Sequence, residues 1–216
     1  MWITTYPGTV LQEFKFRNAR IFYGRSADFC TDTCKDILSD EERLRAVRMQ
    51  NEKHRNTFIA CRVALRTILG NLSGRLAGQI TINISLTGKP CLPEMTLDFS
   101  ISHTPEAFLI GINPEGMIGV DMEMLNGGEN LCGIVDYAFS EKERQYCDSG
   151  KDPTKFLEVW TNKEALLKLN GRGFSANLKE VCTLTENLFA CHPTSVQRMI
   201  FAAPGGETCC VVLLKS

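Results

Sequence analysis

The sequence predicts an α+β fold made of two similar lobes. Segments with the 3.6-residue period of amphipathic helices occur in both halves of the chain, and so do runs in which apolar and polar residues alternate as in strands. Short turns rich in glycine and proline separate these segments. The turn at residues 113–116 is the expected boundary, so we expect an N-terminal lobe over residues 1–114 and a C-terminal lobe over residues 115–216.

The N-terminal half is expected to open with one or two strands within residues 1–25. Ser39 and Glu42 have the spacing of a capping box, which predicts the start of a helix, and the helical pattern continues to Gly70. Alternating apolar residues predict the strands that follow, at 80–84, 97–101 and 108–112.

The C-terminal half repeats this mixture, beginning with a strand over 117–123. Ser140 and Glu143 have a second capping-box spacing. An Asp-Pro start and a glycine end predict a longer helix over about 152–170. Weaker strands are expected at 181–190, 196–202 and 208–214.

Composition narrows the classes of function. The chain has 216 residues and a net charge of −1, so it lacks the overall basic field that attracts nucleic acid. No apolar run approaches the roughly 20 residues that span a bilayer. The N-terminus has no charged and apolar leader, so we expect a cytoplasmic protein without nucleic-acid or membrane partners. The ten cysteines lack the spacing of a metal site and are expected to be free thiols.

The first candidate site is the pair Asp121 and Glu123 on the expected strand 117–123. Side chains two residues apart on a strand point to the same face, roughly 7 Å apart. Two carboxylates so placed repel each other unless a cation lies between them, and a hard divalent ion is the natural partner. The alternative is a solvated strand face, on which acidic residues are common.

The second cluster lies on the expected helix over about 152–170. Trp160, Glu164 and Lys168 are spaced four apart and therefore share one face. A Glu–Lys pair at this spacing is usually a surface ion pair that contributes a few tenths of a kcal/mol. The tryptophan on the same face would partly desolvate the pair, so the cluster is either part of a site or a surface ion pair.

The third cluster is Ser102 and His103, at the end of an expected strand. Both side chains donate hydrogen bonds and are compatible with binding a phosphate, although a lone histidine is more often structural. Lys89, in a Gly-Lys-Pro turn, could supply another cation. A local basic cluster precedes them in the helical stretch and consists of Arg43, Arg45, Arg48, Lys53, Arg55, Arg62 and Arg66.

Five motifs, taken in their order along the chain, resemble those of the Sfp-type 4′-phosphopantetheinyl transferases, which activate nonribosomal peptide and polyketide synthases. The motifs are Gly-Lys-Pro at 88–90, Ser-Ile-Ser-His-Thr at 100–104, Gly-Val-Asp-Met-Glu at 119–123, Phe-Ser-Glu-Lys-Glu at 139–143, and Trp-Thr-Asn-Lys-Glu-Ala-Leu-Leu-Lys at 160–168. The family usually has asparagine where this chain has Ser100. The resemblance implies a monomer whose two lobes form a pseudo-dimer within one chain.

The resemblance also implies a reaction and its residues. The 4′-phosphopantetheine moiety of coenzyme A would pass to a serine of an apo acyl or peptidyl carrier protein, with release of 3′,5′-ADP, as in holo-[acyl-carrier-protein] synthase activity. Asp121, Glu123 and Glu164 would hold Mg²⁺ or Mn²⁺. The catalytic residues would be His103, Glu164 and Lys168, with Glu164 also a candidate base. Coenzyme A would contact Arg45, Arg48, Arg62, Lys89, Ser102, His103 and Lys168, with the three arginines as unranked candidates for its 3′-phosphate.

Two other functions fit the same residues. A Mg²⁺-dependent hydrolase of coenzyme A or a similar pyrophosphate would use water as the nucleophile and release free phosphopantetheine. A non-catalytic protein that binds coenzyme A or a carrier would keep its binding when Glu164 is lost. The sequence does not say whether the carrier serves fatty-acid, polyketide or nonribosomal peptide biosynthesis.

Overall fold

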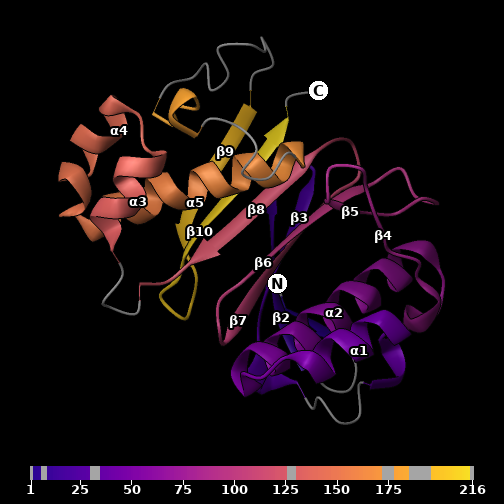
Figure 1. The fold of residues 1–216 in the computed structure, drawn as a ribbon. Coiled ribbons are helices and arrows are strands. Elements are labelled where there is room, and N and C mark those ends of the chain that lie inside the picture. Colours follow the sequence, from indigo (N-terminus) through magenta and orange to yellow (C-terminus); the bar gives the residue numbers. More distant parts are fainter. Residues whose placement is uncertain are drawn as a thin grey trace.

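The computed structural model describes residues 2–5, 9–29, 35–125, 130–171, 178–184 and 196–214. Their fold is a mixture of helices and two main sheets, which confirms the predicted α+β class (Figure 1). Among these residues, no helix combines the length and the apolar character needed to cross a bilayer.

The first sheet has five strands in the antiparallel order β1-β2-β3-β7-β6. Its strands are β1 (Trp2–Thr5), β2 (Thr9–Phe16), β3 (Ala19–Arg25), β6 (Asp98–His103) and β7 (Ala107–Asn113). Two helices, α1 (Asp40–Arg48) and α2 (Glu52–Ser73), lie on one side of this sheet (Figure 1). The apolar face of α2 packs with Phe22, Phe99 and Phe108 to form one hydrophobic core.

The second sheet has three antiparallel strands in the order β8-β10-β9. They are β8 (Ile118–Glu123), β9 (Val196–Ala202) and β10 (Thr208–Leu214). The long helix α5 (Pro153–Asn170) packs on one face of this sheet, and the short helices α3 (Leu131–Ala138) and α4 (Glu141–Tyr146) pack around α5 (Figure 1). A two-stranded ribbon of β4 (Asn83–Ile84) and β5 (Pro90–Cys91) completes the strands.

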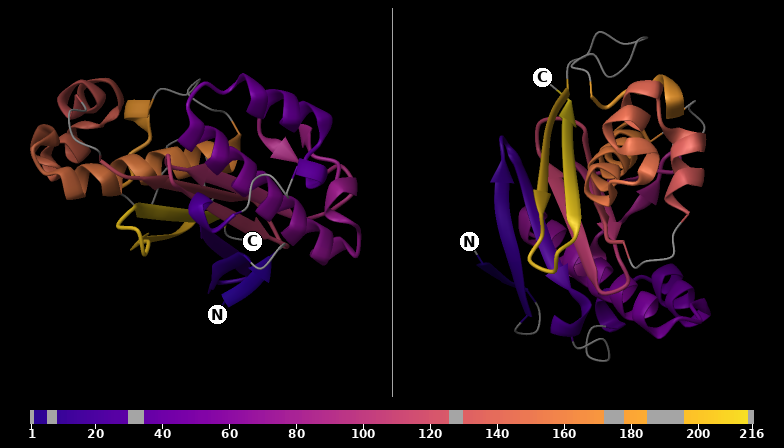
Figure 2. Two further views of the ribbon diagram at one scale, coloured as in Figure 1. Left: turned by 90° about the horizontal axis from the view of Figure 1, so that it is seen from below. Right: turned by 90° about the vertical axis from the view of Figure 1, so that its left-hand side faces the viewer.

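The two main sheets pack face to face, which places them between the helical layers (Figure 2). Successive side chains of a strand point to opposite faces of its sheet. Alternate residues of one strand therefore show what covers each face. On β3, Phe22 packs towards α2, whereas Ile21 and Tyr23 pack against β8 and β10. On β10, Cys209 packs into this contact between the sheets and Cys210 packs towards α5.

Side chains join β6 to β8 where the two sheets meet. The Asp98 carboxylate accepts a hydrogen bond from the Ile118 N–H at 2.8 Å, and the Ser100 hydroxyl accepts one from the Val120 N–H at 3.1 Å. The Ser102 hydroxyl then donates to Asp121 at 2.8 Å. At this junction, hydrogen bonds from the side chains of alternate β6 residues connect β6 to β8 in place of backbone-to-backbone hydrogen bonds.

Both predicted capping boxes are present, and both begin helices at the expected residues. Ser39 caps α1 together with Glu42, and Ser140 caps α4 together with Glu143. Helix α5 ends as predicted at Gly171, whose φ of 65° lies in the left-handed region that favours glycine.

Four expectations for the elements need correction. Residues 1–25 contain three strands, β1 to β3, rather than one or two. The continuous helix expected up to Gly70 is two helices, because the Asn51 side chain accepts a hydrogen bond from the His54 N–H and starts α2 anew. The strand expected over 80–84 shrinks to Asn83–Ile84. Residues 181–184 are irregular, with a turn at 183–184, and do not start a strand, and the rest of that expected strand, 185–190, lies outside the described residues. Helix α3 was not expected.

Candidate functional site

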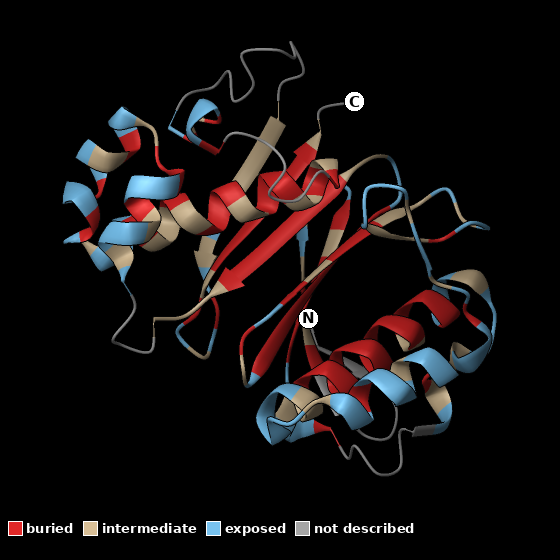
Figure 3. Cartoon of the chain, in the orientation of Figure 1, coloured by how far each residue is buried: buried red, intermediate tan, exposed pale blue. Residues whose placement is uncertain are grey.

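Strand β8 carries the first two site residues. The strand is buried along nearly all of its length (Figure 3). Ile118, Val120 and Met122 point into the core between the sheets, as predicted, which leaves Asp121 and Glu123 on the opposite face. Asp121 is only 2% exposed, so it does not lie on a solvated strand face. Its Oδ1 accepts hydrogen bonds from Ser102 at 2.8 Å and from the Lys168 ammonium at 2.6 Å, whereas its buried Oδ2 has no hydrogen-bond partner among the described residues.

Helix α5 brings Glu164 and Lys168 to the same place. The helix packs directly on the backbone of β8, because Gly119 has no side chain to hold it away: a Cβ there would lie 1.9 Å from the Ala165 carbonyl oxygen. The Lys168 ammonium contacts the Ser102 hydroxyl at 2.9 Å in addition to Asp121. The structure thus joins all three predicted clusters through one lysine.

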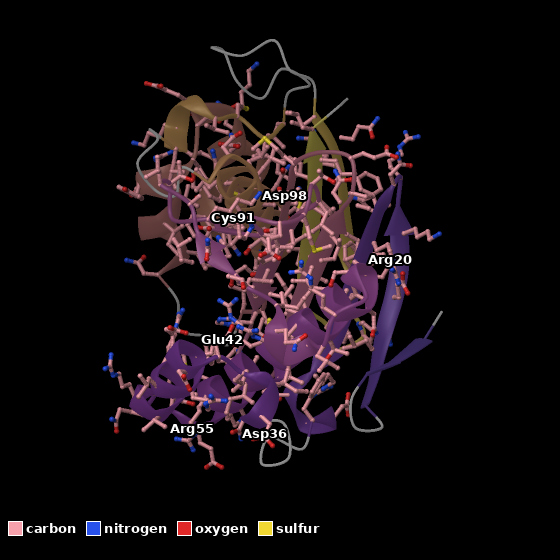
Figure 4. The ribbon with its side chains drawn as sticks, turned by 90° about the vertical axis from the view of Figure 1, so that its right-hand side faces the viewer. Arg20, Asp36, Glu42, Arg55, Cys91 and Asp98 are labelled. Carbon is pink, nitrogen blue, oxygen red and sulfur yellow. The ribbon has the colours of Figure 1, made fainter. Side chains whose placement is uncertain are left out.

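Helices α1 and α2 form the facing wall. Arg45 and Arg62 both lie over the Phe58 ring, with guanidinium carbons 5.0 and 5.6 Å from the ring centroid. Glu42, labelled in Figure 4 on the α1 and α2 layer, holds Arg66 at 2.7 Å and lies 3.7 Å from Arg62. Arg62 is therefore a largely buried cation that already has an anionic neighbour.

A cavity of about 370 Å³ connects these walls. The predicted residues that line it are Arg45, Arg62, Ser102, His103, Asp121, Glu123, Glu164 and Lys168. Phe58, Cys61 and Ile101 also line it and were not predicted. Phe58 and Cys61 belong to the apolar face of the expected helix, and a helical period alone does not distinguish the wall of a cavity from the core.

Two predicted residues lie outside this cavity. Arg48 is exposed on α1 and does not line it. Lys89 lines a neighbouring cavity of about 300 Å³ that shares Ile101, Glu164 and Lys168 with the first. The Lys89 ammonium is held by the Asp98 carboxylate and by the carbonyl oxygens of Ile118 at 3.0 Å and Leu169 at 3.4 Å. Figure 4 labels Asp98 of β6 and Cys91 of β5, two strands that contact each other, near the same part of the molecule.

The carboxylates of the cavity have perturbed protonation. Burial, and then the charge of Asp121, raise the pKa of Glu123 to about 7. The same two causes raise the pKa of Glu164 to about 7, against the opposing effect of Lys168. Desolvation and the charge of Lys168 lower the pKa of His103, so its imidazole is neutral near pH 7. Three acidic groups thus share a site in which their full ionisation is unfavourable without an added cation.

The arrangement suits an anionic ligand that brings a cation with it. Within the described part of the chain, no three His, Cys, Asp or Glu side chains approach closely enough to form a ready-made metal site. Lys168 instead occupies the position beside Asp121 Oδ1. Arginine, lysine and histidine donors face carboxylates across one cavity, which is the combination that binds phosphates through a divalent ion.

Comparison with known proteins adds an independent observation. Residues 117–202 match the family model of the 4′-phosphopantetheinyl transferase superfamily. The chain is 36% identical over 151 residues to 4′-phosphopantetheinyl transferase HetI of Nostoc sp., which covers 67% of this chain and 63% of HetI. It is 33% identical over 151 residues to slr0495 of Synechocystis sp., itself named only as a predicted 4′-phosphopantetheinyl transferase, which covers 67% of this chain and 61% of slr0495.

A third relative is 4′-phosphopantetheinyl transferase ffp of Bacillus subtilis, 28% identical over 154 residues that cover 68% of this chain and 66% of ffp. The chain therefore spans less than two thirds of the length of these relatives. The matched segment 117–202 contains Asp121, Glu123, Glu164 and Lys168. Ser102 and His103 reach the same cavity from outside that segment.

Proposed function

This chain belongs to the 4′-phosphopantetheinyl transferase superfamily, in its Sfp-type class, and we propose that it transfers the 4′-phosphopantetheine arm of coenzyme A to a serine of an apo carrier protein. The observation that carries the proposal is the single cavity in which three carboxylates face Arg45, Arg62, His103 and Lys168. The proposed products are the holo carrier and 3′,5′-ADP.

Asp121, Glu123 and Glu164 are the proposed holders of Mg²⁺, for which Mn²⁺ could substitute. The buried Oδ2 of Asp121, which has no partner among the described residues, and the raised pKa values of the two glutamates fit the binding of a divalent cation. Bound there, the ion would supply charge neutralisation for the pyrophosphate of coenzyme A. Lys168 is then free to turn from Asp121 towards the same phosphates.

The remaining site residues are assigned to coenzyme A. Arg45 and Arg62 are the proposed contacts of the 3′-phosphate, and exposed Arg48 is a peripheral third candidate. His103 and Ser102 would donate hydrogen bonds to phosphate oxygens. Lys89 would lie along the nucleotide from the neighbouring cavity, while its bonds to β6, β8 and α5 keep the cavity wall together.

The transfer step uses the carrier serine as nucleophile. Its hydroxyl oxygen forms a bond to the β-phosphorus, and the bond from that phosphorus to the oxygen of the departing 3′,5′-ADP breaks. Glu164 is the proposed acceptor of the hydroxyl proton, directly or through a water. Lys168 offsets the charge that develops on the phosphates.

We also propose that residues 1–114 and 115–216 form two lobes of a pseudo-dimer. Each half places one long helix, α2 or α5, on the outer face of its own sheet, and the inner faces meet. The carrier is proposed to be an acyl or peptidyl carrier without further distinction, so a specific holo-[acyl-carrier-protein] synthase activity stays a prediction. The expected monomer in the cytoplasm, without nucleic-acid or membrane partners, also stays a prediction.

The decisive experiment is an intact-mass assay of apo carriers of the fatty-acid, polyketide and peptide types with coenzyme A and Mg²⁺. We expect the mass of one phosphopantetheine to be added to a carrier. Release of free phosphopantetheine without a modified carrier would instead identify a hydrolase. Coenzyme A binding without any product would identify a binding protein.

Two matched pairs of variants connect that activity to the cavity. Glu164→Gln should lower kcat by about 100-fold, whereas Glu158→Gln on the same helix should leave it unchanged. Lys168→Met should lower kcat more than it raises KM for coenzyme A, because charge on the phosphates grows in the transition state. Its control is Lys155→Met, since Lys155 pairs with Asp152 in an exposed position on the same helix. If kcat fell equally in the control variants, the reaction could not be assigned to the cavity.

A further inference from the structure

A second cluster of charged residues lies behind α5, outside both cavities. Glu143 of α4 and Lys163 of α5 are 0% and 1% exposed, and their charged atoms are 2.9 Å apart. Two opposite charges removed from water are stable only when all their hydrogen-bonding capacity is used. The role of this pair is not explained by the chemistry assigned to the cavity.

Every donor and acceptor of the pair is engaged. The Lys163 ammonium donates to Glu143 and to the carbonyl oxygens of Leu178, at 2.8 Å, and Val181. Oε1 of Glu143 accepts from the backbone N–H and the hydroxyl of Thr183, at 2.7 and 2.8 Å. Its Oε2 accepts from the N–H and the hydroxyl of Ser140, both at 2.8 Å, in the capping box of α4. The pair thus connects α4, α5 and the segment 178–183.

The geometry connects this cluster to the candidate site. Lys163 and Glu164 are neighbours on α5, and successive side chains of a helix project about 100° apart. An ammonium tied to three acceptors on two separate segments fixes the rotation of the helix about its own axis, which non-directional apolar contacts do not. Since α5 also touches the β8 backbone at Gly119, both its rotation and its distance from Asp121 are set.

We propose that Glu143 and Lys163 are positioning residues that aim Glu164 and Lys168 at Asp121. This inference rests on the function proposed for the cavity. It states that the pair acts through the orientation of α5 and not through contact with coenzyme A. Loss of the pair should therefore weaken metal binding and turnover while the contacts made by Arg45, Arg62 and His103 persist.

The test uses Lys163→Met, which keeps the length of the side chain, and Glu143→Gln, which keeps its shape. The double variant Glu143→Gln/Lys163→Met removes both charges together. Arg144→Met is the matched control, because Arg144 follows Glu143 on α4 and pairs with Asp136 at 2.8 Å on the outside. The dissociation constant of Mn²⁺ is measured by electron paramagnetic resonance without coenzyme A, and kcat and KM are measured with a carrier.

We expect Mn²⁺ binding and kcat to fall by about tenfold in each single variant, with KM for coenzyme A within about twofold of wild type. The double variant should recover melting temperature without recovering Mn²⁺ affinity, which separates positioning from a purely structural role. The control should match wild type. Should Lys163→Met fail to fold, the same comparison is made with Glu143→Gln.

A folded single variant with wild-type Mn²⁺ affinity and kcat would overturn the inference. A wild-type protein that binds no Mn²⁺ would overturn it together with the metal assignment. A wild-type protein that binds Mn²⁺ but modifies no carrier would instead contradict the proposed function, and the Mn²⁺ affinities of the variants would still decide the positioning role.

Discussion

Asp121 interacts electrostatically with three other charged side chains of the cavity, those of Glu123, Glu164 and Lys168. It raises the pKa values of Glu123 and Glu164, and it holds the Lys168 ammonium at 2.6 Å. Asp121→Asn keeps the size of the side chain but removes its charge, so both glutamate pKa values should fall towards their ordinary value near 4.5. Transfer activity should fall by at least about 100-fold, because a proposed metal ligand is lost.

NMR titration of the glutamate carboxyl groups measures the first effect, and a carrier assay measures the second. Glu115→Gln, on the exposed turn after β7, is the control and should change neither quantity. Unchanged titration of Glu123 and Glu164 in Asp121→Asn would show that burial alone perturbs them, and normal turnover would remove Asp121 from the site.

The same residues predict how the stability of the metal-free protein depends on pH. In the folded state Glu123 and Glu164 retain protons up to about pH 7, whereas in the unfolded chain they release them near pH 4.5. Between these values the folded state binds more protons, so the free energy of unfolding falls as pH rises, by several kcal/mol in total, since each pKa unit corresponds to about 1.4 kcal/mol. Urea titrations in EDTA at pH 5, 6, 7 and 8 measure this slope.

Excess Mg²⁺ should remove most of that loss at pH 8, and Glu123→Gln/Glu164→Gln should remove the slope itself. Parallel curves with and without Mg²⁺ would count against both the shared repulsion and the metal assignment.

At the scale of elements, the contact between α5 and β8 depends on Gly119. A methyl group there would overlap the Ala165 carbonyl oxygen at 1.9 Å and the Leu169 nitrogen at 2.6 Å, and helix backbone cannot move aside as a side chain can. Gly119→Ala should therefore destabilise the fold by about 3 kcal/mol or more and separate Glu164 from Asp121. Gly116→Ala, whose nearest new contact is at 3.7 Å, should be nearly neutral in chemical denaturation. Similar midpoints for both variants would contradict the close packing.

How far the elements follow from the sequence depends on whether their signals are local. Both capping boxes and the Gly171 end of α5 were predicted correctly, because each is set by a few neighbouring residues. The break between α1 and α2 was missed, since Asn51 was read as a helical residue rather than as a cap. Helix α3 was missed because it packs against α5 and offers few signals of its own.

The candidate site shows the same division between local and distant information. Alternation on β8 placed Asp121 and Glu123 on one face, and helical spacing placed Glu164 and Lys168 on another, both from local periodicity. No pattern within the sequence could show that Lys168 would reach Asp121 and Ser102, or that Phe58 would line the same cavity. These contacts between residues distant in the sequence depend on how the sheets and helices pack.

At the scale of the molecule, the two proposed lobes share a core. Ile21, Tyr23 and Leu109 of the first sheet pack against Val120 and Val211 of the second. The Tyr23 hydroxyl also donates to the buried carboxylate of Glu207, at 3.3 Å, just before β10. The site itself takes residues from both halves, since β6 and α2 face β8 and α5 across it. Function and stability should therefore depend on the same contact.

This arrangement predicts that neither half is stable alone. Separated fragments 1–114 and 115–216 would each expose one apolar sheet face, at a cost of about 25 cal/mol for every Å² left in water. We expect each fragment to lack a cooperative urea transition by circular dichroism, and an equimolar mixture to regain one. In the intact chain, circular dichroism and tryptophan fluorescence should give coincident transitions, because the shared core couples the halves. Two separate transitions in the intact chain, or a fragment that unfolds cooperatively by itself, would show that the lobes are independent domains. The shared core would then contribute less to holding the two sides of the cavity together than we infer.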